Sequence, residues 1–259
     1  MAGKKRVLLT LLEENDGLAK LLGSELSKSG LDVAAHFLDT NQDAMAIANV
    51  SRELATYQAW VVAGNDFANP LLRKTLAIIA LNIQNDAGSN FPIIISPSAS
   101  TKDLESLPTP LKSAEIVKNG LGAKVAVRAA TFKPNLAEYR LKAHDLGRLG
   151  LWFEVGPREG FWKGAFFASG IAQDEKGVPT SHGVGIAGTI PEKCTLNYPV
   201  EGMKLSVHDI PCVGFGVHNE FNANTSYYVR VSAYPDEILF GAFPDDDETD
   251  LYSLTLLGS

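Results

Sequence analysis

Cysteine is scarce in this sequence: Cys194 and Cys212 are the only two among 259 residues, and neither belongs to a CxxC pair. Small secreted domains that depend on disulfides carry a much denser set of cysteines. The low cysteine content therefore excludes a disulfide framework. It predicts a cytoplasmic protein with two reduced, buried thiols.

Basic residues are outnumbered, with 23 Lys and Arg against 30 Asp and Glu, which gives a formal net charge of -7. A chain without a basic cluster gains little affinity by releasing counterions from nucleic acid, and an anionic membrane surface would repel it. We therefore expect neither nucleic acid nor a membrane as a partner. The function is expected to involve small molecules or other proteins.

Long hydrophobic runs are also missing. The first apolar run, residues 7–12, is interrupted by Thr10 and followed by acidic residues, so it is too short for the apolar region of a signal peptide. The most apolar helical stretch, residues 71–83, contains Arg73 and Lys74 and falls short of the ~20 residues that span a bilayer. We expect no signal peptide and no transmembrane segment.

The turn after the first apolar run lacks a glycine-rich phosphate motif. Neither GxGxxG nor GxxxxGK[ST] stands there; residues 13–17 read Glu-Glu-Asn-Asp-Gly, without the glycines that let a pyrophosphate approach the backbone. The GxSxG motif of serine hydrolases is absent from the sequence as well. Tight binding of a dinucleotide or triphosphate in the usual manner is therefore not expected.

The composition changes near residue 135. Eight of the 23 glycines precede this point, and the later segments are repeatedly broken by Gly and Pro. The first part alternates predicted strands with helices, whereas the second consists of short predicted strands. We therefore predict two domains, an α/β domain over residues 1–134 and an all-β domain over residues 135–259.

Hydrophobic periodicity locates the elements of the first domain. Residues 6–12 are almost continuously apolar, as expected of a strand that is covered on both faces. Asn15 or Asp16 can cap the next helix, which ends before Gly30. Its inward positions are Leu18, Leu21, Leu22 and Leu26. Further strands are predicted over residues 32–38, 59–63, 91–95 and 124–130, and further helices over residues 41–56, 68–84 and 111–118.

Strands separated by helices require right-handed parallel crossovers. Five such strands in roughly 130 residues fit an open, flavodoxin-like parallel sheet with the strand order 2-1-3-4-5. In the second domain we predict strands over residues 139–144, 149–155, 161–168, 183–189, 204–207, 213–218, 226–233, 237–242 and 251–257. Nine short strands predict a β-sandwich, with a β-barrel as the alternative.

The layout of residues 5–130 resembles that of receiver domains. A receiver domain has an acidic pair after strand one, which Glu13 and Glu14 match, and a phosphorylated Asp near the end of strand three, where Asp66 lies about two residues further on. Ser96 or Ser98 matches the hydroxyl that follows strand four. Lys133, before Pro134, matches the lysine after strand five. The resemblance implies a site for phosphotransfer.

The same layout resembles Toll/interleukin-receptor domains. That resemblance implies cleavage of NAD by a catalytic Glu on the helix after strand three, but residues 68–84 contain no Glu. Both resemblances concern the architecture, and a shared fold does not by itself carry a function.

The predicted strand order places one group of polar side chains together. Open α/β sheets bind ligands in the crevice at the carboxyl ends of their strands. The residues expected there as a ligand-binding site are Glu13, Glu14, Asp16, Asp39, Asn65, Asp66, Ser96 and Ser98. Their carboxylates could hold a divalent cation such as Mg²⁺ or accept hydrogen bonds from ribose hydroxyls. Alternatively, Asn15, Asp16, Asp39 and Asp66 cap helices and form turns.

A second candidate site is a metal centre in the all-β domain. His218 and Glu220 stand two apart, so they would project from one face of a strand. With His208 they would supply two histidines and one carboxylate, a set that chelates Fe(II) or Zn²⁺. Surface histidines that make ordinary hydrogen bonds are the alternative explanation.

These observations predict a cytoplasmic binding or interaction protein, in which a flavodoxin-like domain with a degenerate pocket is joined to a β-sandwich that mediates assembly. A protein partner or self-assembly is expected, and a small molecule is a further candidate. The alternative is an enzyme that acts on a nucleotide-like or phosphorylated small molecule at Glu13, Glu14, Asp39 and Asp66, with a divalent cation. A metal-dependent enzyme in the β-sandwich is the third hypothesis.

Overall fold

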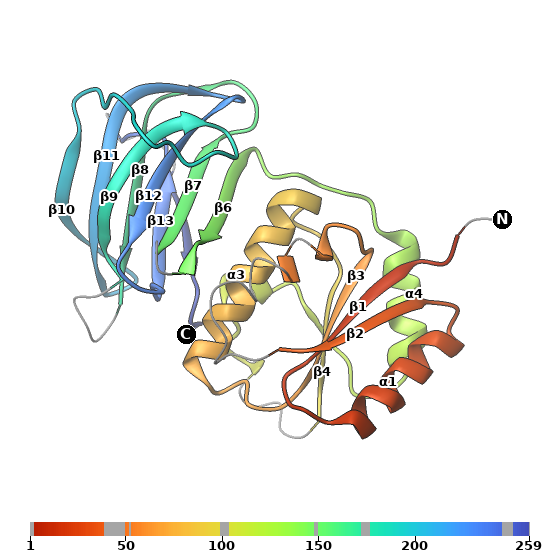
Figure 1. Cartoon of the computed structure of the whole chain (residues 1–259). Helices are drawn as coiled ribbons and strands as arrows, with labels where there is room; N and C mark the ends of the chain where they lie inside the picture. The colour runs from red at the N-terminus through yellow and green to blue at the C-terminus, as the bar shows by residue number, and fades with distance from the viewer. Residues whose placement is uncertain are drawn as a thin grey trace. The chain divides into compact units, whose positions relative to one another are not determined.

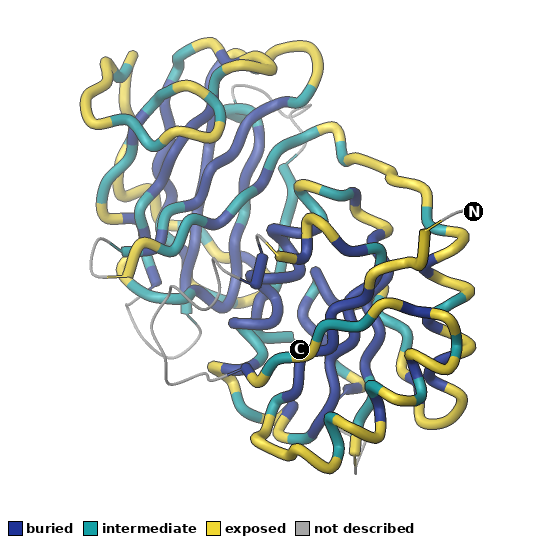
Figure 2. Tube along the Cα trace, turned by 45° about the vertical axis from the view of Figure 1, so that its right-hand side comes forward, coloured by how far each residue is buried: buried dark blue, intermediate teal, exposed yellow. Residues whose placement is uncertain are grey.

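The computed structural model describes residues 3–38, 50, 51, 53–98, 104–147, 150–171, 177–244 and 251–258. By their contacts these residues divide into two compact units, Met1–Leu136 and Ala137–Ser259. Asp39 and most of the helix expected over residues 41–56 lie outside the described residues. Figure 1 shows the elements, and Figure 2 shows that the strands are largely buried while many loops are exposed.

The first unit contains a five-stranded sheet in the order β2-β1-β3-β4-β5, in which all neighbouring strands are parallel. This confirms the predicted flavodoxin-like order. The strands are β1 (Arg6–Leu11), β2 (Asp32–Phe37), β3 (Ala59–Gly64), β4 (Ile93–Pro97) and β5 (Glu115–Ile116). The central β3 is buried at every position, as its run of apolar residues requires.

Helices cover both faces of this sheet. Helices α1 (Asp16–Lys28) and α4 (Leu121–Thr131) lie along one face, and α3 (Pro70–Ala87) lies along the other (Figure 1). Alternate residues of β1 and β3 join α1 and α4 in one apolar cluster, to which α1 contributes Leu22 and Leu26. Leu21, expected to face inward, is instead 65% exposed, because the interior-facing stripe of α1 passes through Leu18, Leu22 and Leu26.

The fifth strand lies at a different place in the sequence from the one expected. Residues 124–130, predicted to be a strand, belong to helix α4, and the helix predicted over residues 111–118 is replaced by a 3-10 turn, η2 (Thr109–Leu111), and the two-residue strand β5. Val125 and Ala129 are buried, whereas Val127 between them is 61% exposed. Burial at every fourth residue is the pattern of a helix, and a strand would have buried Val127 as well.

The second unit has nine described strands in two antiparallel sheets. One sheet has the order β10-β11-β8-β13-β14 and the other β6-β7-β12-β9. The bounds are β6 (Tyr139–Asp145), β7 (Leu151–Pro157), β8 (Phe161–Gly170), β9 (Pro179–Ile186), β10 (Val200–Val207), β11 (Ile210–Asn222), β12 (Thr225–Val231), β13 (Glu237–Gly241) and β14 (Leu251–Thr255). Each overlaps a predicted strand, and two separate sheets make a sandwich rather than a barrel.

Aromatic side chains fill the space between these two sheets. Phe153 of β7 stacks on Phe167 of β8, with ring centroids 5.2 Å apart, and His182 of β9 meets the Phe215 ring of β11 edge-on at 5.0 Å. Tyr227 and Val229 of β12 are fully buried as well. Such aromatic pairs add about 0.5–1.5 kcal/mol each beyond the area that they bury.

The two thiols are both free, but they differ in exposure. Cys212 is buried in β11, as expected, whereas Cys194 is exposed, so the expectation of two buried thiols is wrong for Cys194. Cys194 belongs to the connection between β9 and β10, whose Pro191 side chain lies over Gly183 and Gly185. Among the described residues, no helix is long and apolar enough to cross a membrane.

Candidate functional site

The carboxyl ends of β1 and β3 lie side by side, as the parallel sheet requires. The Leu12 amide donates to the Ala63 carbonyl at 3.0 Å, and the Ser98 amide donates to the Gly64 carbonyl at 3.0 Å. Beyond these backbone bonds, Asn65 Nδ2 lies 3.5 Å from Glu13 Oε1. The structure therefore brings Glu13 and Asn65 together. We call the segment ends formed by residues 12–16, 64–66 and 96–98 the acidic rim.

The space between the ends of β1 and β3 is narrow. A Cβ atom on Gly64, where φ is +136°, would lie 3.0 Å from the Leu12 Cβ atom. Leu12 therefore occupies the position beside Gly64, and only glycine fits that close approach without strain. Asp66 also has a positive φ, of 66°, and it is exposed at the turn. A bulky ligand cannot enter between the two strand ends at this point.

Several rim residues serve the helices that begin there. Asn15 Oδ1 accepts from the Leu18 amide at 2.9 Å and caps α1. Asn69 Oδ1 accepts from the Leu71 and Leu72 amides and caps α3, while Asn69 Nδ2 donates to Asp66 Oδ2 at 3.2 Å. Asn15 is therefore a helix cap and Asp66 a turn residue, as the alternative explanation for these residues expected. These bonds satisfy backbone amides that would otherwise lack partners.

The remaining rim side chains are acidic or hydroxylic, and most of them face solvent. Glu13, Glu14 and Asp16 are exposed in the segment that leads into α1, Ser98 is exposed, and Ser96 is half-buried opposite Ala63. The amino end of a helix attracts anions, but carboxylates at that end repel a phosphate group. A cation suits these oxygen atoms better. Among the described residues, however, no three His, Cys, Asp or Glu side chains gather closely enough to hold a metal ion.

One match to receiver domains is wrong. Lys133 follows helix α4, not the fifth strand, because residues 124–130 are helical. The fifth strand ends at Ile116, so Lys133 does not occupy the position after it that the resemblance assigns to the lysine.

The structure does not form the metal centre expected from His208, His218 and Glu220, all of which are described. His208 lies in the turn before β11, where its Nδ1 is 3.1 Å from Glu237 Oε1. His218 lies ten residues further along, about 30 Å at the rise of a strand, and it packs on Phe243. A bulge between Val217 and Glu220 breaks the alternation that would have aligned His218 with Glu220.

The sequence did not reveal a series of hydrogen-bonded polar side chains on the parallel sheet. Trp60 Nε1 donates to Thr10 Oγ1 at 2.8 Å, and Thr10 Oγ1 lies 2.6 Å from His36 Nε2. Burial lowers the pKa of His36, and the carboxylate of Glu53 only partly opposes that effect. A neutral His36 can accept a hydrogen bond from the Thr10 hydroxyl. The polar atoms of these three side chains are therefore hydrogen-bonded to one another across β2, β1 and β3.

A buried carboxylate, Glu154 of β7, is the centre of a larger network that the sequence did not reveal. Only 2% of Glu154 is exposed. Its Oε2 is 2.8 Å from His144 Nε2, and its Oε1 accepts from the Gly188 amide and the Ser226 hydroxyl, each at 2.8 Å. Burial alone would raise the pKa of Glu154, but these hydrogen bonds outweigh burial and lower it to about 2.

Arg140 extends this network across the sandwich sheet. Its guanidinium donates to the carbonyls of Pro157 and Thr225 at 2.7 Å and to that of Ala223 at 2.9 Å. A side chain on Gly156 would lie 2.8 Å from Arg140 Nη2, so glycine leaves room for the guanidinium. Arg140 therefore ties β6 and β7 to the β11–β12 turn, which is a structural role.

Residues 183–188 read GxGxxG, the pattern of dinucleotide-binding loops, but their surroundings differ from such a loop. They lie at the end of the antiparallel strand β9 and not at a strand-to-helix turn, which that motif requires. Gly183 and Gly185 leave space for Pro191, which would lie 3.0 and 3.1 Å from their added Cβ atoms. The Gly188 amide serves Glu154. These glycines permit packing of a loop and do not form a phosphate site.

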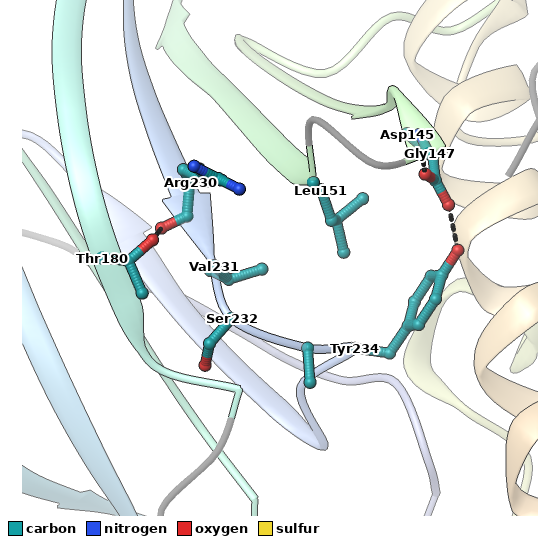
Figure 3. Close-up of a pocket in the computed structure, with 10 residues that line it drawn as sticks. Asp145, Gly147, Leu151, Thr180, Arg230, Val231, Ser232 and Tyr234 are labelled. Carbon is teal, nitrogen blue, oxygen red and sulfur yellow. Dashed lines mark hydrogen bonds between the residues drawn. The ribbon is translucent and has the colours of Figure 1, made fainter.

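The sandwich also contains a pocket of about 560 Å³, which falls in the usual range for small-molecule sites. It lies at one end of the four-stranded sheet, where β6 and β12 end and β7 and β9 begin (Figure 3). Its walls are formed by Asp145, Gly147, Gly150, Leu151, Thr180, Arg230, Val231, Ser232, Ala233 and Tyr234. None of these residues was among the site residues expected from the sequence.

Comparisons with known proteins do not assign a family. No protein-family model matches the chain, and no curated protein matches it. Among solved structures, the chain is similar to a diflavin flavoprotein A3 from Nostoc sp., with 13% identity, a TM-score of 0.32, and coverage of 50% of this chain and 91% of that one. It is also similar to a "putative diacylglycerol kinase" from Bacillus anthracis str. Sterne, with 10% identity, a TM-score of 0.30, and coverage of 98% and 84%. TM-scores this low do not establish a relationship, so the fold class is defined by the strand order.

Proposed function

We propose that this chain is a cytoplasmic binding or interaction protein, with a degenerate pocket in its flavodoxin-like unit and a β-sandwich that mediates assembly. One observation carries the proposal: three exposed carboxylates, Glu13, Glu14 and Asp16, stand at the start of α1, where a flavodoxin-like fold would receive the phosphate of its ligand. Three like charges at that place disfavour a nucleotide or flavin phosphate.

Exposed apolar side chains of the sandwich support the assembly part of the proposal. Phe161 is paired with Asn222 at the end of β11, and Ile186 is paired with Thr225 at the start of β12. The turn that joins β11 to β12 therefore has both side chains beside it. They are 63% and 71% exposed, although burying each would be favourable by about 1.5–3 kcal/mol. Large apolar groups exposed at one end of a domain are typical of a protein–protein contact.

The second candidate function is an enzyme that acts on a nucleotide-like or phosphorylated small molecule at the acidic rim. The contact between Asn65 and Glu13 favours it, because it places an amide and a carboxylate together at the carboxyl ends of two parallel strands. A divalent cation bound by the rim carboxylates would have to offset their charge before such a substrate could bind.

A sedimentation experiment tests the assembly proposal. We expect the average mass of the protein to rise with concentration, and we expect Phe161→Ser together with Ile186→Ser to suppress that rise. Val127→Ser, which removes an exposed apolar side chain from α4, is the matched control and should leave the association unchanged. A wild-type protein that stays monomeric at every concentration and binds no protein would contradict assembly.

A thermal-shift screen with FMN, ATP and Mg²⁺ separates the two functions. Any ligand that binds only the folded protein raises the melting temperature. The binding proposal predicts no shift with these ligands. The enzyme hypothesis predicts a shift with Mg²⁺ plus ATP that Glu13→Gln abolishes and that Glu105→Gln, at an exposed position outside the rim, leaves intact.

A further inference from the structure

The pocket of the sandwich has a cationic group, the guanidinium of Arg230, on its wall. Within the part of the chain that the structure describes, no carboxylate forms an ion pair with the guanidinium of Arg230. Arg140 of the same sheet differs, because backbone carbonyls and Glu154 surround it. An arginine that lines a cavity without an anionic partner keeps its five N–H donors for a ligand.

The position of the Arg230 side chain is fixed by Gly150, which lies beside it. Gly150 has φ +92°, and a Cβ atom built on it would lie 2.6 Å from Arg230 Nε and 3.2 Å from Nη2. The guanidinium therefore lies directly on the backbone of Gly150, where any other residue would displace it. Strand pairing fixes the backbone of Arg230, because this residue is paired with Trp152 of β7 on one side and with Ser181 of β9 on the other.

A hydrogen-bonded pair forms another part of the wall. The Tyr234 hydroxyl donates to Asp145 Oδ2, and Asp145 Oδ1 accepts from the Gly147 amide at 3.0 Å (Figure 3). Burial and the adjacent Asp145 raise the pKa of Tyr234, so the phenol stays protonated and continues to donate. Each Asp145 oxygen has a second lone pair and can still accept from a ligand.

Apolar atoms separate these two polar groups. The side chains of Leu151 and Val231 lie between Arg230 and the Asp145–Tyr234 pair in the close-up view (Figure 3). Leu151 is opposite both Asp145 of β6 and Val231 of β12 in the strand pairing, which places it centrally at this end of the sheet. A pocket with an apolar middle and a few convergent polar groups is the usual form of a small-molecule site.

We propose that this pocket binds a small organic carboxylate that has an apolar body and a donor group, such as an ammonium, at the opposite end. The carboxylate is held by the forked N–H donors of Arg230, the body lies on Leu151 and Val231, and the donor group reaches Asp145. Asp145 makes a singly charged carboxylate preferable to a phosphate, because a second negative charge on the ligand would be repelled. This site is separate from the acidic rim and does not depend on it.

Calorimetric titration of the full chain with four probes tests the assignment. The probes are 4-(aminomethyl)benzoate, which has a carboxylate and an ammonium at opposite ends of an apolar ring; benzoate, which lacks the ammonium; benzylamine, which lacks the carboxylate; and inorganic phosphate. We expect 4-(aminomethyl)benzoate to bind most tightly, benzoate more weakly, and benzylamine and phosphate not measurably. Equal or tighter binding of phosphate would overturn the carboxylate assignment, and no binding of either carboxylate would overturn the site.

Three variants connect that binding to the pocket. Arg230→Gln should weaken 4-(aminomethyl)benzoate binding about ten- to a hundredfold, which is the usual contribution of a hydrogen-bonded charged pair. Lys163→Gln removes the same charge from an exposed position of β8 and should change nothing. Gly150→Ala should weaken binding while keeping the charge, and its circular dichroism would show that the fold is retained. Unchanged affinity in Arg230→Gln would overturn the proposal.

Discussion

At the scale of single residues, Glu154 is a buried carboxylate whose partners are all provided by the sandwich. Its carboxylate is removed from water, yet three donors hold it in the ionised form. Removing an ionised group from water is costly, and only a complete set of hydrogen bonds offsets that cost. Ser226, His144 and Gly188 come from different strands and a loop, so the network forms only when the four-stranded sheet has its native register.

We predict that Glu154→Gln destabilises the protein at neutral pH by roughly 3 kcal/mol, the value of a pKa lowered from 4.5 to about 2. The folded-state pKa is the lower one, so the stabilisation is complete above pH 4.5 and disappears as the pH falls toward 2. Urea denaturation of wild type and variant across this range would measure the difference. Glu159→Gln, at an exposed position of the same region, should show no such pH-dependent difference.

This carboxylate could not be found from the sequence. Residues 151–155 were correctly predicted to be a strand, but nothing in them indicates whether the acidic side chain faces water or a closed network. The partner Ser226 is 72 positions away, and Gly188 lies in a loop. The rim was easier to locate, because Glu13 and Asn65 directly follow two strands whose parallel pairing could be predicted.

At the scale of elements, the contact between α1 and α4 shows where helix packing becomes tightest. The Gly122 amide donates to Glu25 Oε1 at 3.1 Å, and a Cβ atom on Gly122 would lie 2.3 Å from Ser29 Oγ and 2.7 Å from the Glu25 carbonyl oxygen. The backbones of the two helices therefore approach each other at a point where no side chain fits.

Two glycine substitutions should have opposite effects on stability. Gly122→Ala forces α1 and α4 apart and should lower the free energy of unfolding by about 1–3 kcal/mol, the usual cost of overpacking. Gly23→Ala, in α1, meets nothing within 4 Å and should instead raise it by up to about 1 kcal/mol through helix propensity. Chemical denaturation followed by circular dichroism would measure both. A loss of stability in both variants would contradict the close approach as the cause.

The wrong prediction for the fifth strand shows why the last elements of the first unit were difficult to predict. Val125 and Ala129 are four apart, a spacing that fits both the period of two of a strand and the 3.6-residue period of a helix. Valine favours strands, so the pattern of residues 124–130 indicated a strand. Only the exposure of Val127 distinguishes the two, and exposure depends on tertiary packing.

At the scale of the whole molecule, the chain divides into two compact units after Leu136. The first has its own apolar cluster between the sheet and α1 and α4, and the second has the aromatic core of the sandwich. The domain boundary predicted after residue 134 stays a prediction. A unit with a complete core can fold without its neighbour.

We therefore expect the fragment comprising residues 137–259 to fold when it is produced alone. Its circular dichroism should be that of a β-protein, and it should unfold cooperatively. Proton NMR that shows dispersed methyl resonances would provide a second measurement. A fragment that stays disordered would show that the sandwich depends on residues 1–136 and would contradict the division into two domains.

The two cysteines should report on unfolding of the whole molecule. Cys194 is exposed, whereas Cys212 is buried, and burial together with Glu237 raises the pKa of its thiol to about 11. We expect one thiol to react rapidly with a disulfide reagent under native conditions and the second only in denaturant, because the thiolate is the reactive form. In Cys194→Ser the rapid reaction should be absent. Two rapidly reacting thiols in the native wild type would disprove the burial of Cys212.

Strand β8 pairs with β11 and β13, which follow it by several dozen residues in the chain. During synthesis on the ribosome, Phe166 and Phe167 of β8 are therefore made well before the strands that will shield them. The parallel sheet is made before them and can begin to fold first. Until β11 and β13 follow, we expect β8 to be the segment that a chaperone would protect.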